Sequence, residues 1–261
     1  MSWSIIAAVN NEQILNSCLL ASPDINSASE VVLQTGYTSA ADAYNAGIGR
    51  SSGEIMVFAH QDVYLPEGWA NRAQKCIEAI AADDPDWGVI GIYGVKKDGR
   101  HAGHVYYHKV MGERFEGGME VATLDELLLI VRRSSGLKFD PDLDGFHMYG
   151  ADICLEAGRR GMKSYAISAF CVHNSNDYKL LPLQFWKAYF YMRKKWKSQL
   201  PIKTTCIEIT RYYWPMIRWN FIHSVNLALG RKRIVKRVSD PTLLYSLCSP
   251  KRANQASNVT S

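Results

Sequence analysis

The stretch Ile55-Met-Val-Phe-Ala-His-Gln-Asp-Val63 decides how this chain folds. Its apolar first half is typical of a strand buried on both faces of a parallel sheet. Asp62 comes directly after that strand, and ligands of open α/β sheets bind outside the carboxyl ends of the strands. A carboxylate there can hold Mg²⁺ or Mn²⁺. An Asp that only caps the following turn would give the same local pattern.

Strands and helices alternate before this stretch. Apolar runs at residues 4–9 and 30–34 enclose a helix-compatible segment at 12–20, and a second such segment at 39–48 precedes the quoted strand. This alternation predicts an α/β fold with a mostly parallel central sheet flanked by helices.

The order of elements is less regular after the quoted strand. We expect further strands at residues 87–93, 120–124, 127–132 and 163–172, and one late helix at 150–161. Residues 94–120 are rich in Gly, His and Tyr and have no helical period. They predict a long mobile flap over the active face of the sheet, because long loops in compact domains are usually functional or mobile.

Length and composition limit the class of protein. The chain has 261 residues, of which 47% are hydrophobic and 21% charged, which fits a globular protein and excludes a disordered or fibrous one. No two of the six cysteines have the C-x-x-C spacing of a zinc or redox motif. The first apolar run follows no basic residues and ends at Asn10, so it does not resemble a signal peptide. We therefore expect a cytoplasmic protein.

The composition becomes aromatic and basic near residue 178. We expect a catalytic domain at 1–178, a helical extension at 179–248 and a disordered tail at 249–261. Much of the net charge of +5 lies after residue 186, which favours an anionic partner. Residues 212–229 are too polar to span a membrane but could form an interfacial helix, so the protein could be membrane-associated. Docking onto the catalytic domain or a second subunit is the alternative. No nucleic-acid motif is present, and we expect no nucleic-acid partner.

Several short motifs occur in a fixed order along the chain. They are Asn11-Glu12, Ala43-x-Asn45-x-Gly47, Ser52-Gly53-Glu54, His60-x-Asp62, Asp152-Ile-Cys-Leu155 and His173. This order resembles the family-two inverting glycosyltransferases, and His-Gln-Asp in place of Asp-x-Asp resembles their glycosyltransferase-like subgroup. The resemblance covers roughly residues 2–175. It implies a GT-A (Rossmann-like) fold, here with a C-terminal helical extension.

The resemblance also implies an activity. An inverting enzyme of the hexosyltransferase type would transfer sugar from a nucleotide-diphosphate sugar to a glycan or lipid-linked acceptor, as in surface polysaccharide synthesis. Asp152 would be the general base, at a helix start whose dipole keeps it ionised. A divalent metal ion, Mn²⁺ or Mg²⁺, would be held by His60, Asp62 and His173. The donor would contact His60 and Asp62 together with Ala8, Val9, Asn11, Glu12, Gln34, Asn45 and Gln61, and the acceptor would lie against His147 and Tyr149.

Three positions depart from the family pattern. His60 replaces the first Asp of the metal motif, and a neutral imidazole can bind Mn²⁺ but suits Mg²⁺ poorly. Gln34 replaces the acidic residue that ends the second strand and contacts the nucleotide, so the identity of the nucleotide is not predicted. Ala151 replaces the Glu that precedes the base.

The residues themselves also allow other interpretations. Asp152 could simply stabilise the first turn of its helix, His173 could be a hydrogen-bonded structural residue, and His147 and Tyr149 could pack in an aromatic loop. A metal-dependent nucleotidyl or phosphoryl transferase would also use a carboxylate at the sheet edge, but residues 9–12 do not form its usual Gly-rich loop. A non-catalytic binding module that uses the basic C-terminal region is the third alternative.

Overall fold

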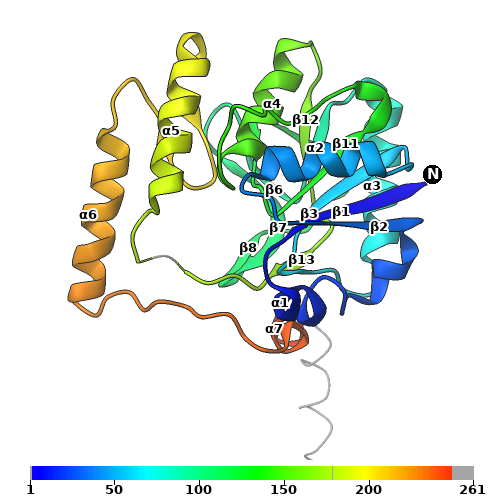
Figure 1. The fold of residues 1–261 in the computed structure, drawn as a ribbon, viewed down its shortest axis with the longest axis horizontal. Helices are drawn as coiled ribbons and strands as arrows, with labels where there is room; N and C mark the ends of the chain where they lie inside the picture. The colour runs from blue at the N-terminus through cyan, green and yellow to red at the C-terminus, as the bar shows by residue number, and fades with distance from the viewer. Residues whose placement is uncertain (1, 178, 249–261) are drawn as a thin grey trace, which may run out of the picture.

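The computed structural model describes residues 2–177 and 179–248, and its centre is a seven-stranded sheet (Figure 1). In the order β2-β1-β3-β11-β5-β12-β9, the strands are Glu30–Thr35, Trp3–Val9, Ile55–His60, Leu128–Arg132, Val89–Gly91, Ser164–Ile167 and Gly118–Val121. β1 pairs in parallel with β2 and β3, and β5 does so with β12. β11 and β9 run antiparallel to the strands beside them. The prediction of a mostly parallel α/β sheet is confirmed, with these two strands reversed.

α2 and α4 pack on one face of this sheet and α3 packs on the other. In chain order, the helices of the described residues are α1 (Glu12–Ser17), α2 (Ala40–Arg50), α3 (Trp69–Asp83), α4 (Tyr149–Arg159), α5 (Leu183–Lys195), α6 (Trp214–Ala228) and α7 (Pro241–Cys248), with 3₁₀ turns at Pro23–Ser27, Arg133–Ser135 and Lys197–Gln199. Side chains of β3 alternate between two hydrophobic clusters. Met56 and Phe58 join the cluster that contains α2 and α4, whereas Val57 and Ala59 join the one that contains α3. Each large side chain buried in this way contributes ~1.5–3 kcal/mol, which holds β3 in the interior of the sheet between β1 and β11.

A second sheet lies where the sequence predicted a mobile flap. Its path β10-β6-β7-β13-β4 consists of Thr123–Leu124, Tyr93–Val95, His101–Tyr107, Cys171–His173 and Val63–Tyr64, and β8 (Lys109–Gly112) pairs with β7. The flap prediction for residues 94–120 is therefore wrong. Gly112 lies so close to Gly103 that a Cβ on it would meet the Gly103 carbonyl oxygen at 1.9 Å. These glycines permit close backbone packing in a β-hairpin.

The C-terminal part begins inside the core and ends at the surface. Phe185, Tyr189 and Met192 of α5 are buried in the same cluster as α4. After the short hairpin of β14 (Ile202–Lys203) and β15 (Glu208–Ile209), α6 stands at the side of the molecule, and the chain then returns along its edge to α7 (Figure 1). The predicted boundary at residue 178 and the predicted disordered tail at 249–261 lie outside the described residues. Within the described residues, no helix has the length and apolarity to cross a membrane.

Candidate metal and donor site

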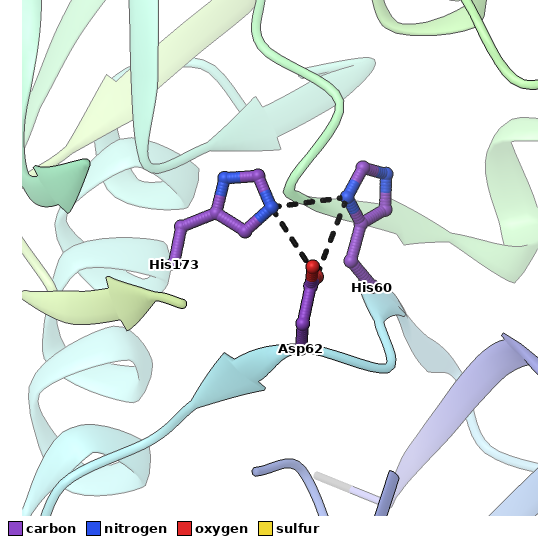
Figure 2. Close-up of side chains that lie close together, drawn as sticks. All are labelled: His60, Asp62 and His173. Atoms are coloured by element: carbon purple, nitrogen blue, oxygen red, sulfur yellow. Dashed lines mark hydrogen bonds and ion pairs between the residues drawn. The ribbon is translucent and has the colours of Figure 1, made fainter. Parts of the chain in front are cut away.

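Three polar side chains meet where β3 and β13 end. His60 is the last residue of β3, and Asp62 lies in the turn between β3 and β4. Antiparallel pairing of β4 with β13 places His173 opposite Val63. Figure 2 shows the three side chains pointing toward one another. The structure thus brings together the three residues that were predicted to bind a metal ion.

The distances within this trio fit a divalent cation. Asp62 Oδ1 lies 3.2 Å from Nε2 of His173 and 4.0 Å from Nδ1 of His60, and these two nitrogens are 3.4 Å apart. Ligand atoms that are each ~2.1 Å from one ion can be at most ~4.2 Å apart, so one ion could contact all three atoms. Two imidazoles and one carboxylate suit Mn²⁺ or Zn²⁺ better than Mg²⁺.

Tyr149 fixes the tautomer of His60. The Tyr149 hydroxyl donates to the Glu126 carbonyl oxygen at 3.0 Å and lies 2.6 Å from His60 Nε2. Since the hydroxyl proton is used, Nε2 of His60 must donate to the hydroxyl oxygen, and Nδ1 keeps its lone pair toward Asp62 and His173. A second hydrogen bond that orients a histidine ligand in this way is typical of metal sites. Tyr149 therefore contacts His60 through Nε2, the ring nitrogen that does not face Asp62 and His173. The predicted position of Tyr149 on the acceptor side stays a prediction.

Burial and charge act differently on the three groups. Burial, reinforced by His173, lowers the pKa of His60 to about 4, so this imidazole is neutral at neutral pH. Burial favours the neutral form of Asp62, but His173, His60 and Arg237 outweigh it and hold the Asp62 pKa below its usual range. Burial also lowers the pKa of His173, and Asp62 outweighs that effect and raises it. The trio thus offers an ionised carboxylate and a free imidazole lone pair.

Arg237 reaches the site from the far end of the chain. Its Nη2 donates to Asp62 Oδ2 at 2.6 Å, and its Nε donates to the Asn174 carbonyl oxygen at 2.7 Å. Asp62 is 7% exposed, so this ion pair is largely removed from water. Nothing near residue 237 in the sequence pointed to this role, which depends on a contact between residues 175 positions apart.

The end of β1 lies beside this site. Gln61 Oε1 accepts from the backbone N–H groups of Asn10 and Asn11, each at 3.1 Å, and Gln61 Nε2 donates to Asn10 Oδ1 at 2.6 Å. Asn11 also caps α1 by accepting from Ile14 N. Hydrogen bonds therefore join the turn after β3 to the turn after β1. The predicted donor residues Ala8, Val9, Asn11, Glu12 and Gln61 belong to these two adjacent strand ends.

Two other predicted donor residues have structural contacts instead. Gln34 is 1% exposed, and its Oε1 accepts from Arg50 at 3.3 Å beside α2. Asn45 uses both ends of its amide on the backbone of Phe139, at 2.8 and 3.0 Å. The structure corrects the prediction for these two residues, because their side chains join α2 to its neighbours and are not presented to a ligand.

Asp152 lies in a closed ion-pair cluster between α4 and α5. Asp152 is 2% exposed, and its carboxylate accepts from Lys195 Nζ at 2.7 and 2.8 Å and from the indole N–H of Trp196 at 2.7 Å. Lys195 also contacts Asp140 at 2.5 Å. Burial raises the pKa of Asp152, and Lys195 and Trp196 only partly oppose this effect. A carboxylate engaged in this way is not presented to an acceptor hydroxyl, so the structure does not support Asp152 as the base.

Glu126, in the turn between β10 and β11, places a carboxylate beside the first residues of α4. The sequence did not reveal this carboxylate. A Cβ on Gly150 would lie 3.1 Å from Glu126 Cγ, and backbone N–H groups of Met148, Gly150 and Tyr149 face the Glu126 carboxylate. Burial and neighbouring Asp125 nevertheless raise the Glu126 pKa well above its ordinary value. The three backbone N–H groups oppose this effect by favouring the ionised form, which is the form that can accept a proton.

His147 lies in the loop that precedes α4. Its ring packs edge-to-face on Phe185 of α5, with ring centroids 5.2 Å apart. Burial lowers the pKa of His147 to about 4, so it is neutral at neutral pH. Its position on the acceptor side stays a prediction.

Comparisons with known proteins agree with this architecture. Residues 4–187 match the model of a family described as "Glycosyltransferase like family". A protein of Fuscovulum blasticum named "ATP synthase subunits region ORF 6" is 33% identical over 136 residues, which are 48% of this chain and 53% of that protein. This chain thus matches about half the length of its curated relative.

The comparisons with solved structures include two glycosyltransferases. The crystal structure of GalNAc-T7 with UDP, GalNAc and Mn²⁺ has a TM-score of 0.53 at 12% identity, and the similarity covers 76% of this chain and 48% of that one. A mannosyltransferase from Pyrobaculum calidifontis, solved with GDP-Man and Mn²⁺, has a TM-score of 0.47 at 12% identity, covering 94% and 79%. The similarity to GalNAc-T7 shows that the chain has the predicted GT-A fold. Because the family match spans more than half of its residues, the chain belongs to the glycosyltransferase-like family.

Proposed function

We propose that this protein is an inverting glycosyltransferase that moves a sugar from a nucleotide-diphosphate sugar to a hydroxyl of a glycan or lipid-linked acceptor. The convergence of His60, Asp62 and His173 at the carboxyl end of the central strand is the observation that supports this function most. A site at this edge of an α/β sheet is where a nucleotide ligand is expected. GalNAc-T7, which shares the fold, was crystallised with UDP and Mn²⁺.

The trio would hold the cation that accompanies the donor. A divalent cation bound there neutralises the diphosphate as it leaves the sugar. The chain supplies the ionised Asp62, the neutral His60 whose proton is held by Tyr149, and His173 from the neighbouring strand. Because these groups are fixed by two sheets, they need little rearrangement when charge develops on the leaving group. Residues 8–12 and Gln61 would contact the nucleotide beside them.

Glu126 is our choice for the group that removes the acceptor's proton. Inversion by a single displacement needs one base on the acceptor side and no covalent nucleophile. The Glu126 carboxylate lies at the start of α4, and the carbonyl of the same residue accepts from the Tyr149 hydroxyl that contacts His60. Glu126 is therefore close to the trio, whereas Asp152 is occupied by Lys195 and Trp196.

A donor-hydrolysis assay tests the function. Purified protein is incubated with a panel of nucleotide sugars, with Mn²⁺ or with chelator, and products are separated. We expect one donor to yield a nucleoside diphosphate and free sugar in Mn²⁺ and not in chelator. Release of a nucleoside monophosphate and a sugar phosphate would instead indicate a nucleotidyl or phosphoryl transferase. Failure of every donor to bind or react would favour a non-catalytic module.

We further propose that α6 rests on an anionic membrane surface, where a lipid-linked acceptor would be found. Met216 and His223 face the body of the protein and are buried. The opposite side exposes an apolar stripe made of Trp214, Ile217, Phe221, Ile222, Val225 and Leu229. Basic residues adjoin the stripe at 211, 218, 231 and 233. Apolar and aromatic side chains beside Arg and Lys fit the headgroup region of an anionic bilayer.

Vesicle sedimentation tests this contact. We expect the protein to sediment with phosphatidylglycerol vesicles and less with phosphatidylcholine vesicles. Trp214→Ser with Phe221→Ser should abolish sedimentation without changing donor hydrolysis. Equal sedimentation of this variant and the unchanged protein would contradict the proposal, and a dimer that the variant disrupts would identify a second copy as the partner.

A further inference from the structure

The segment between α6 and α7, residues 231–240, crosses the edge of the candidate metal site. Asn174, which is 2% exposed, accepts from Val238 N at 3.0 Å and donates to Val238 O at 2.8 Å. The Asp177 N–H donates to Val235 O at 2.9 Å, and Lys232 forms an ion pair with Asp177 at 3.0 Å. These contacts hold the backbone on both sides of Arg237. The position of the Arg237 guanidinium is therefore built into the fold.

Arg237 and the two imidazoles use opposite oxygens of the same carboxylate. His60 and His173 face Oδ1 of Asp62, while Arg237 Nη2 donates to Oδ2. A cation held by the trio could thus coexist with the guanidinium. Among residues 2–177 and 179–248, Arg237 Nη1 has no hydrogen-bond partner. The Arg237 side chain is 21% exposed, so part of it remains open to solvent and to a ligand.

The charges of the site point to an anion with about two negative charges. A divalent cation and ionised Asp62, with neutral imidazoles, leave about one net positive charge. Arg237 adds a second. Guanidinium groups bind phosphate oxygens through paired, charge-assisted hydrogen bonds. A bridging diphosphate, which has about two negative charges, would balance the cation and Arg237 together.

We propose that Arg237 is a binding residue for the donor's diphosphate, standing beside the cation and donating its free N–H groups to a phosphate oxygen. This assignment rests on the proposed function and adds a residue that lies 50 positions beyond the family match, which ends at residue 187. A purely structural partner of Asp62 would behave differently. It would affect binding of the cation, through the carboxylate, as much as binding of the anion.

Two binding measurements separate these roles without any turnover. Mn²⁺ affinity is measured by electron paramagnetic resonance, and inorganic pyrophosphate affinity is measured by calorimetry at saturating Mn²⁺. The variants are Arg237→Gln, Arg237→Lys and, as a matched control, Lys236→Gln, which removes an exposed positive charge from the adjacent residue. Thermal unfolding of each variant shows whether it is folded.

The expected result is selective. Arg237→Gln should weaken pyrophosphate binding by about 10- to 100-fold, the usual range for a charge-assisted contact. Its Mn²⁺ affinity should stay equal or rise, because a nearby positive charge is removed. The pyrophosphate affinity of Arg237→Lys should lie between those of Arg237→Gln and the unchanged protein. Lys236→Gln should bind both Mn²⁺ and pyrophosphate as the unchanged protein does.

Three outcomes would overturn the assignment. Unchanged pyrophosphate affinity in Arg237→Gln would show that Arg237 does not bind phosphate. An equal loss of Mn²⁺ and pyrophosphate affinity in Arg237→Gln would show that Arg237 only holds Asp62. A parallel loss of pyrophosphate affinity in Lys236→Gln would show that the effect is one of general charge. In each of these cases the unchanged protein still binds Mn²⁺, so the proposed function stands. If the unchanged protein bound no Mn²⁺, the proposed metal site itself would fail, and this assignment with it.

Discussion

Asp62 and Asp152 are both buried carboxylates paired with a cation, yet their surroundings differ. Asp62 is 7% exposed and Asp152 is 2% exposed. The cation at Asp152 is Lys195, from a helix packed into the core, and Trp196 completes the contacts. The cation at Asp62 is Arg237, from a surface segment, and two imidazoles face the other oxygen. A carboxylate enclosed by core residues stabilises the fold, whereas a carboxylate beside two imidazole nitrogens can bind a metal ion.

Replacing Asp62 should have the largest effect. In Asp62→Asn the trio loses its charged ligand, and we expect Mn²⁺ affinity and sugar transfer to fall by more than ~100-fold, beyond the range seen for outer-shell changes. The unfolding temperature of the metal-free protein should also fall at neutral pH, because His173 and Arg237 lose the carboxylate that they contact. Calorimetry with Mn²⁺ and thermal unfolding check both statements. Retained Mn²⁺ affinity would mean that Asp62 is not a ligand.

Replacing Asp152 should lower stability without changing Mn²⁺ binding. Removing one partner of a buried ion pair costs ~3–5 kcal/mol, and we expect about 2–3 kcal/mol for Asp152→Asn because Lys195 keeps its contact with Asp140. Mn²⁺ affinity should not change. Urea unfolding measures the first quantity and calorimetry the second. A folded, stable variant that binds donor but fails to transfer would restore Asp152 as the base.

The base can be tested directly at Glu126. Glu126→Gln keeps the size of the side chain and removes its ability to take a proton, so we expect the transfer rate to fall by about 10²- to 10⁴-fold. Mn²⁺ affinity should remain. Measuring kcat and Mn²⁺ affinity together separates a base from a metal ligand. Unchanged kcat would exclude Glu126 from the reaction.

The hydroxyl behind His60 should have a smaller effect. Tyr149→Phe removes the group that holds the His60 proton on Nε2, and outer-shell changes of this kind typically weaken metal binding by about 10- to 100-fold. Tyr191→Phe is a matched control, because its hydroxyl bonds Asp140 in the Asp152 cluster instead. We expect Mn²⁺ affinity to fall in the first variant and not in the second. Equal affinities would mean that Tyr149 does not orient His60.

The two aspartates should also respond oppositely to acid in metal-free protein. The Asp62 pKa is lowered, so its contribution to stability is present above the ordinary Asp pKa and is lost as pH falls. The Asp152 pKa is raised, so protonation favours the folded state at low pH and this contribution is lost as pH rises. The free-energy difference from the unchanged protein should therefore shrink on acidification for Asp62→Asn and not for Asp152→Asn. Urea unfolding between about pH 3 and 6 measures both. If the free-energy differences of the two variants changed with pH in the same direction, the predicted difference between Asp62 and Asp152 would be wrong.

The sequence predicted the central strand and the trio because both depend on local pattern. Five consecutive apolar residues require burial on two faces, and the residues after them must then lie at the sheet edge. His173 followed from the order of motifs. Asp152 was less predictable, since a carboxylate in the first turn of a helix can serve as a base or as a structural partner. Only the position of Lys195, 43 residues later, distinguishes the two.

Contacts over long sequence distances explain the remaining errors. Arg237 meets Asp62 only because Asn174 binds the backbone at Val238, and no local pattern encodes that contact. The glycines at 103 and 112 look like flexible positions in sequence, whereas the paired strands need them for close approach. Gln34 follows the right strand, but the packing of α2 encloses it.

Anomalous diffraction at the manganese edge tests the central claim most directly. Crystals grown with Mn²⁺ and a nucleoside diphosphate should show one strong peak within coordination distance of His60 Nδ1, Asp62 Oδ1 and His173 Nε2, with the diphosphate next to it. A peak elsewhere, or none at saturating Mn²⁺, would contradict the assignment of this edge of the sheet as the donor site.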